Sequence, residues 1–254
     1  MHIEGIRPKQ SKALKIMLLS LSLLFLSIVL ESFIIAVLVL IGIFIHETGH
    51  LKAAEYLDIK HRGIYFLPGL GAVALINEIP KNRAKECFIA LAGPCFGAIY
   101  SLALAMMFVV TGFQFLALGA FYNAFINLFN LLIPIDPLDG GRVIKSMTFS
   151  IHPVIGKLVL ICSIILSFYL AFHGMILFWL VGIAGIYGFI DEIKNNRKRP
   201  KMRWFDIGYS FFGTIAIAIL LIISFVIGGS GRFSKSRGII HIDDQRTTEV
   251  SEVY

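Results

Sequence analysis

The stretch 32–55, SFIIAVLVLIGIFIHETGHLKAAE, joins an apolar run long enough to cross a lipid bilayer to the polar string HETGH. A membrane-spanning helix needs about 20 predominantly apolar residues. Side chains four residues apart lie on one face of a helix, so His46 and His50 point to the same side and Glu47 stands beside them. Ionisable groups in such a span are costly, and they indicate a functional site.

The whole chain has the composition of a membrane protein with several spans. Of its 254 residues, 57% are hydrophobic and 15% are charged, whereas a soluble domain is about half apolar and a quarter charged. Segments of spanning length lie at 13–30, 32–55, 86–110, 115–135, 154–172, 174–190 and 206–228. The sequence therefore predicts an all-α polytopic membrane protein with six to seven transmembrane helices.

The segments divide the chain into four parts. These are an N-terminal cytoplasmic segment with the first helix (1–31), a membrane core that carries the HETGH and LDG motifs (32–150), C-terminal helices (151–228) and a flexible tail (229–254). The tail follows a glycine-rich stretch and carries mixed charges, which is typical of flexible segments. Within the core, segment 61–80 is apolar but too short to span. Its glycines and Pro68 predict a β-strand or re-entrant hairpin that lines a cavity.

The basic residues predict how the chain is oriented in the bilayer. The net charge is +7, and most of the 23 lysines and arginines fall in alternate loops, between apolar runs. The positive-inside rule then puts the N-terminus and the HETGH end of the second span in the cytoplasm. This distribution indicates a lipid bilayer as the partner and argues against nucleic acid. The compact chain suits a prokaryotic inner membrane.

The HETGH string has the spacing of a zinc site, with two imidazoles for one ion and a carboxylate to handle water. A catalytic zinc takes three protein ligands and keeps one position open. Two further intramembrane acids, Asp136 and Asp139, lie about 90 residues on, in NLLIPIDPLDGG (130–141). Its prolines and glycines must break the fourth span, which lets a carboxylate turn inward.

Together these motifs resemble the site-2 protease family of intramembrane zinc metalloproteases, in its compact branch without an inserted PDZ domain. The resemblance covers about residues 32–150. That family pairs HExxH with a later LDG motif, which here is Leu138-Asp139-Gly140, and the chain also has Ala92-Gly93-Pro94 in the matching order. The family often has an asparagine near the place where this chain has Gly97.

The resemblance implies a role for each residue of these motifs. One zinc ion per chain would be held by His46, His50 and Asp139, with Asp136 as the reserve ligand, and Glu47 would be the general base. Asn127 or Asn130 would bind the substrate backbone or the developing oxyanion. The alternative for these two asparagines is ordinary hydrogen bonding between helices.

The implied activity is hydrolysis of a peptide bond in or near a transmembrane segment of a membrane-bound regulatory protein, with a membrane regulator as a further partner. Segment 61–80 could offer a strand edge to an unwound substrate. Two other functions stay open. A different class of membrane metalloprotease uses a glutamate as third ligand, although Glu192 lies on a basic segment. A transporter or metal permease could use the same His and Asp groups as an ion path.

Overall fold

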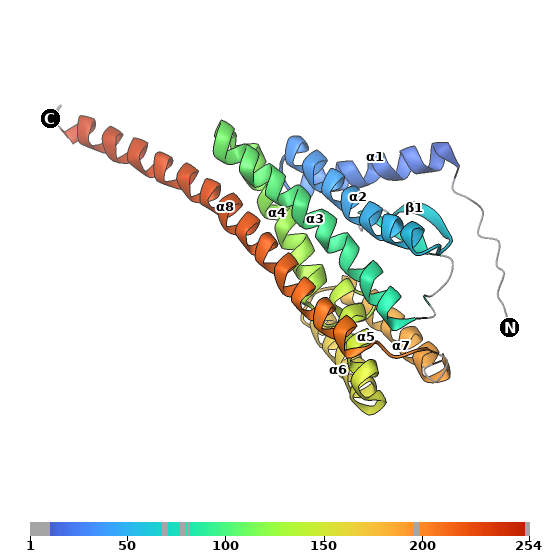
Figure 1. Ribbon diagram of the computed structural model, residues 1–254. Coiled ribbons are helices and arrows are strands. Elements are labelled where there is room, and N and C mark those ends of the chain that lie inside the picture. The colour runs from blue at the N-terminus through green and yellow to red at the C-terminus, as the bar shows by residue number, and fades with distance from the viewer. Residues whose placement is uncertain (1–10, 68–70, 77–79, 81, 196–198, 252–254) are drawn as a thin grey trace.

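The computed structural model describes residues 11–67, 71–76, 80, 82–195 and 199–251. Within these residues the chain forms mostly helices and one small sheet (Figure 1). In chain order the elements are α1 (Lys12–Val29), α2 (Phe33–Tyr56), β1 (His61–Leu67), β2 (Gly71–Ile76), α3 (Arg83–Thr111), α4 (Gln114–Leu132), α5 (Asp139–Ile151), α6 (Pro153–Phe172), α7 (Leu177–Asn195) and α8 (Trp204–Ser251).

In this part of the chain, five helices are long and apolar enough to cross a membrane: α2, α3, α4, α6 and the part of α8 up to Gly231. Two further predicted spans form helices that fall outside this set. The apolar run in α1 is shorter, and the end of α7 carries Asp191, Glu192 and Lys194. The predicted all-α membrane fold is confirmed, and the chain is an integral membrane protein.

Helices α2, α3, α4 and α8 pack together as the centre of the molecule (Figure 1). Small residues let the helices approach closely, as is common between helices in membranes. Ala98 of α3 and Ala124 of α4 are fully buried and pack with Leu221 of α8. The turn between α3 and α4 is tight because Gly112 ends α3 with a φ of 73°, which favours glycine.

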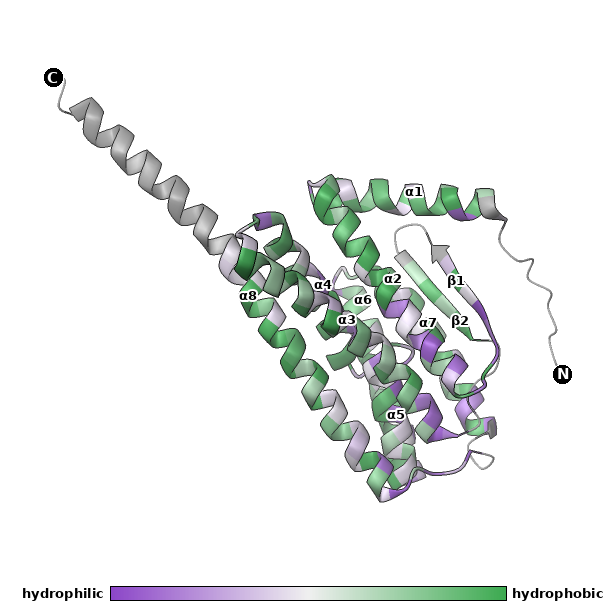
Figure 2. Ribbon diagram, turned by 45° about the horizontal axis from the view of Figure 1, so that its top comes forward, coloured by the Kyte–Doolittle hydropathy of each residue, from purple (hydrophilic) through white to green (hydrophobic). Residues whose placement is uncertain are grey.

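Strands β1 and β2 form an antiparallel hairpin beside α2, with Tyr65 opposite Val73. The hairpin contacts α2 and α1. Figure 2 shows α1 running across the end of α2 instead of along the central helices. The Nζ atom of Lys15 in α1 lies 5.7 Å from the centre of the Tyr65 ring. The prediction of a strand hairpin within 61–80 is therefore confirmed for 61–67 and 71–76, and residues 68–70 and 77–79 lie outside the described residues.

The predicted break after the fourth span is present. Helix α4 ends at Leu132, an extended segment follows, and α5 begins at Asp139. The first residues of α5 can pass close to this segment because they are glycines. A Cβ atom on Gly140 would lie 2.0 Å from the carbonyl oxygen of Leu131, and one on Gly141 would lie 2.2 Å from the carbonyl carbon of Ile135. The two glycines thus fold α5 back against the end of α4.

Helix α8 continues to Ser251, through most of the segment that the sequence predicts to be a flexible tail. Its glycine-rich stretch serves close packing. A Cβ atom on Gly228 would lie 2.6 Å from the carbonyl oxygen of Ala117 in α4, and one on Gly231 would lie 2.6 Å from the Cβ atom of Ala117. Glycine here permits close contact between two helices. The sequence pattern alone does not distinguish such glycines from those of a linker.

Candidate metal centre

His46 and His50 lie one turn apart on α2 and both are buried. Their Nε2 atoms are 3.1 Å apart. Asp139, the first residue of α5, brings its Oδ2 atom to 3.1 Å from Nε2 of His46 and 3.3 Å from Nε2 of His50. The structure therefore places the three predicted ligands around one point, although about 90 residues separate the histidines from the aspartate in the chain.

These separations fit a tetrahedral metal ion. With metal–nitrogen and metal–oxygen bonds of about 2.0–2.2 Å, ligand atoms at tetrahedral corners lie about 3.3 Å apart. Two imidazoles and one carboxylate are a donor set that suits zinc. A further carboxylate, that of Glu47, belongs to the same group of potential ligand atoms as the two histidines, within 4.8 Å of them. The residues present thus fit a metal centre with three ligands and an adjacent acid.

The second ring nitrogen of each histidine is held by a neighbouring helix. Nδ1 of His46 lies 2.8 Å from Oδ1 of Asn127 in α4, and Nδ1 of His50 lies 2.8 Å from the carbonyl oxygen of Ile89 in α3. A carbonyl oxygen can only accept, so each Nδ1–H donates. Both Nε2 lone pairs are then free to bind a metal. Such outer hydrogen bonds orient metal-binding histidines and fix their tautomer.

Helix α3 can approach the histidines because it has glycine at the crossing point. A Cβ atom on Gly93 would lie 2.2 Å from Nε2 of His50 and 2.9 Å from Nε2 of His46. On the α2 side, a Cβ atom on Gly49 would lie 2.6 Å from the carbonyl oxygen of Ala92. The Ala-Gly-Pro motif of the sequence therefore leaves room for the ligand atoms.

The glycine at position 97 also has a spatial reason. A Cβ atom there would lie 2.0 Å from Oδ1 of Asn127, so the amide that orients His46 fills the space of any side chain at position 97. The structure accommodates Asn127 by the lack of a side chain on α3.

The two predicted asparagines contact the ligands. Asn127 bridges α4 to His46 of α2, so the expected hydrogen bond between helices is present. Asn130 is one turn further along. Its Nδ2 donates to Oδ2 of Asp139 at 2.7 Å and lies 3.2 Å from Nε2 of His46. It is therefore a side-chain donor at the rim of the ligand set.

Glu47 has a partner that sequence reasoning missed. The backbone N–H of Ala74 in β2 donates to Oε2 of Glu47 at 2.6 Å. Glu47 is half-buried, and the hairpin thus covers it from the side opposite α3 and α4. A backbone donor leaves no signature in the side-chain sequence, and only the prediction that segment 61–80 lines a cavity pointed to this region.

The reserve ligand, Asp136, is not part of the centre. Lys145 of α5 donates to Oδ1 of Asp136 at 3.0 Å, and both residues are buried. Glu192, the glutamate considered for another class of metalloprotease, pairs with Arg83 and with Arg199. Buried carboxylates are retained where a cation pairs with them. In the structure Asp136 therefore belongs to an ion-pair network, whereas Asp139 lies beside the two histidines.

Two histidines and a glutamate of the membrane-spanning helix α2, together with an aspartate of α5, form a site of the kind that metallopeptidases use. Residues 32–114, which include HETGH, match the family model of Peptidase family M50. This match covers about a third of the chain, and it agrees with the resemblance of the chain to the site-2 proteases.

Two individual proteins are similar in sequence to this chain. A zinc metalloprotease of Methanocaldococcus jannaschii is 30% identical over 119 residues, which cover 45% of this chain and 34% of that protein. Stage IV sporulation protein FB of Bacillus subtilis is 32% identical over 108 residues, 41% of this chain and 37% of that protein. The matched region thus spans about a third of these relatives.

A solved structure, the site-2 protease from Methanocaldococcus jannaschii, is 26% identical to this chain. The match covers 70% of this chain and 86% of that chain, with a TM-score of 0.48.

Proposed function

We propose that this chain is a zinc-dependent endopeptidase that hydrolyses a peptide bond in or near a membrane-embedded segment of its substrate. The observation that carries the proposal is the convergence of Nε2 of His46, Nε2 of His50 and Oδ2 of Asp139 at 3.1–3.3 Å from one another, beside Glu47. One zinc ion per chain fits this set.

The residues around the centre supply the steps of hydrolysis. A bound zinc ion contributes Lewis acidity, which acidifies water and polarises a carbonyl group. Glu47 takes a proton from the attacking water at its carboxylate and returns it to the leaving amine. The N–H of Ala74 holds that carboxylate in place. Nδ2 of Asn130, at the rim of the ligands, is placed to donate to the developing oxyanion.

The β-hairpin supplies a way to hold the substrate. A helical peptide hides its backbone, so it must unwind before a peptide bond can be attacked. Because the N–H of Ala74 points to Glu47, the outer edge of β2 faces the centre. An extended peptide could pair with that edge by β-strand addition, which would lay its backbone beside Glu47.

A substrate class and an orientation in the bilayer complete the proposed function. We propose a membrane-bound regulatory protein as substrate, cleaved at the cytoplasmic side of a prokaryotic inner membrane, with a membrane regulator as an additional partner. Buried ion pairs hold the beginning of α3 against the end of α7 (Arg83 with Glu192) and against α5 (Glu86 with Lys145). These ends carry many basic residues, which supports a cytoplasmic position.

The test uses the purified full chain in detergent with a model transmembrane peptide. The proposal expects cleavage at a single region, identified by mass spectrometry, which stops on removal of zinc with a chelator and returns with added Zn²⁺. The rival function, metal transport, is assayed with the same protein in proteoliposomes. Zinc flux without peptide cleavage would support the transporter and contradict the peptidase.

A further inference from the structure

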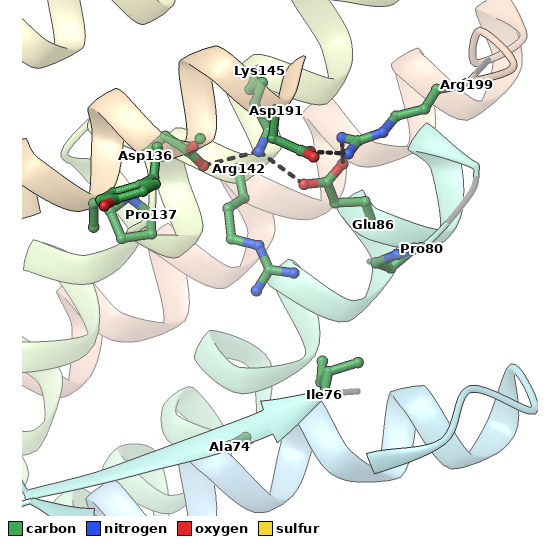
Figure 3. A pocket seen from close by; sticks show the side chains of 13 residues that line it. Ala74, Ile76, Pro80, Glu86, Asp136, Pro137, Arg142, Lys145, Asp191 and Arg199 are labelled. Atoms are coloured by element: carbon green, nitrogen blue, oxygen red, sulfur yellow. Dashed lines mark hydrogen bonds and ion pairs between the residues drawn. The ribbon is translucent and has the colours of Figure 1, made fainter. Parts of the chain in front are cut away.

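A cavity of about 480 Å³ lies next to the metal centre, between β2, α5 and α7 (Figure 3). One wall includes Ala74, whose N–H binds Glu47. Another wall is Asp136 and Pro137, which lead into Asp139. The cavity therefore adjoins both the proposed base and the aspartate ligand, and its volume is within the usual range for binding pockets.

The lining is strongly charged, and most of its charges are paired. Nζ of Lys145 lies 2.9 Å from Oε1 of Glu86 and 3.0 Å from Oδ1 of Asp136. Burial alone lowers the pKa of Lys145, but the two carboxylates outweigh it and raise that pKa, so the lysine stays charged. Lys145 thus neutralises acids from α3 and from the segment before α5.

Arg199 also neutralises acidic side chains, at the other end of the cavity. Its Nη2 lies 2.6 Å from Oδ2 of Asp191, and its Nη1 lies 2.9 Å from Oε2 of Glu192. Nη1 is also 3.8 Å from Oε2 of Glu86. The carboxylates that line the cavity are therefore each held by Lys145 or by Arg199.

Arg142 differs from these two cations. It lies in the first turn of α5, and Figure 3 shows its guanidinium pointing into the open space towards β2, away from the ion-pair network. The charge of Arg142 acts on Glu86 from a distance, but across the described part of the chain its side chain forms no hydrogen bond and no ion pair within 4.0 Å. A guanidinium offers five N–H donors in a fork that matches a carboxylate. A half-buried arginine in this state is a ready anion site.

We infer that Arg142 forms a subsite for an acidic side chain, an aspartate or glutamate, of the peptide substrate. The inference rests on the proposed peptidase function and extends it to substrate specificity. A peptide paired with β2 would run past both Ala74 and Ile76, which line this cavity. Strand residues are about 3.3 Å apart, so the acidic residue would lie within about three positions of the cleaved bond.

A peptide carboxylate fits better than a lipid headgroup or a free anion because the cavity is bordered by the strand edge that would carry the peptide. An ion pair between Arg142 and this carboxylate would also leave the existing pairs of Lys145 and Arg199 intact. The side chain of a bound peptide would supply the acceptor that Arg142 lacks among the described residues.

The test is a set of transmembrane peptides in which a glutamate or a glutamine occupies each of the three positions on either side of the cleaved bond. The measured quantity is the ratio of kcat/KM for the glutamate peptide to that for the glutamine peptide. Wild type is expected to favour glutamate about tenfold or more at one position, as charge-assisted hydrogen bonds do. In Arg142→Gln the ratio should fall to about one, and Arg142→Glu should favour lysine at that position.

Arg203→Gln is the matched control, because Arg203 is 82% exposed and pairs with Asp206 outside the cavity. This variant should keep the wild-type ratio. No preference at any scanned position in wild type, or an unchanged preference in Arg142→Gln, would overturn the inference. Inhibition by inorganic phosphate or by phosphatidylglycerol vesicles, without a preference for acidic peptides, would assign the cavity to a free anion or a lipid and overturn it equally.

Failure of the subsite and failure of the proposed function give different results. Cleavage of the all-glutamine peptide by wild type, but not by Glu47→Gln, establishes the peptidase whatever the ratio. If no peptide is cleaved, binding of fluorescent peptides to the full chain still measures the Kd ratio. An equal Kd for glutamate and glutamine peptides would then reject the Arg142 subsite.

Discussion

Asn130 and Asp139 bind each other twice: Nδ2 of the asparagine donates to Oδ2 of the aspartate at 2.7 Å, and the backbone N–H of the aspartate donates to Oδ1 of the asparagine at 3.2 Å. This pair joins the end of α4 to the beginning of α5. It fixes the only ligand in the described set that does not come from α2, and so it decides whether the three ligand atoms converge.

Removal of this clamp should weaken zinc binding. For Asn130→Ala we expect zinc affinity to fall about ten- to a hundredfold, as is usual when an outer partner of a ligand is lost. A competition titration with a chromogenic chelator measures it. Asn123→Ala is the matched control, because Asn123 lies on the same helix and bonds to Leu38 and Gly119, away from the ligands. Equal affinities for the two variants would contradict the role of the clamp.

The crossing of α3 over the ligands should tolerate no added methyl group. We expect Gly93→Ala to lower zinc affinity at least tenfold, because its Cβ atom would lie 2.2 Å from Nε2 of His50 and the ring must move. Gly208→Ala serves as the control, since nothing lies within 4 Å of a Cβ atom at that position, and alanine favours the helix by about 1 kcal/mol. Wild-type zinc affinity in Gly93→Ala would show that α3 does not limit the site.

The bond between β2 and the proposed base should matter for cleavage but not for metal binding. Ala74→Pro removes the N–H that binds Glu47, at a strand edge where proline is tolerated. We expect zinc content to stay at about one per chain, with kcat/KM at least tenfold lower. Ala74→Gly keeps the donor and should stay within about threefold of wild type. Full activity in the proline variant would argue against both the orienting bond and strand pairing at this edge.

The two aspartates of the broken segment should separate into a ligand and a structural residue. Asp139→Ala should lose zinc binding by a hundredfold or more. Asp136→Ala should keep zinc binding. It should lower the free energy of unfolding by about 1–3 kcal/mol, because buried Lys145 loses one of its two carboxylates. The exposed pair of Asp206 with Arg203 contributes little, so Asp206→Ala should change neither property. Loss of zinc in Asp136→Ala would contradict this division.

The sequence alone predicts the membrane class and the two histidines, and the resemblance of its LDG motif to the site-2 proteases adds Asp139. HETGH is informative because three polar groups are costly within an apolar span. The prolines and glycines of 130–141 require a break, which lets a carboxylate of this segment turn inward. The hairpin in 61–80 could also be predicted, from its length and its glycines.

Other features depend on contacts that no local pattern contains. The bond from Ala74 to Glu47 uses a backbone donor, and Gly97 is explained only by the position of Asn127 on another helix. Gly228 resembles a linker residue in sequence, yet it packs against Ala117 in a continuous helix. Asp136 and Asp139 look equivalent as intramembrane acids until Lys145 is seen to hold one of them.

The most direct test of the account compares wild type with Glu47→Gln in two measurements, zinc content per chain and cleavage of a model transmembrane peptide. The amide keeps the size of the side chain but cannot accept the proton from water. We predict about one zinc per chain in both proteins, with cleavage reduced by at least a thousandfold in the variant. Equal cleavage by both proteins, or no zinc in wild type, would contradict the assignment of a zinc peptidase with Glu47 as its base.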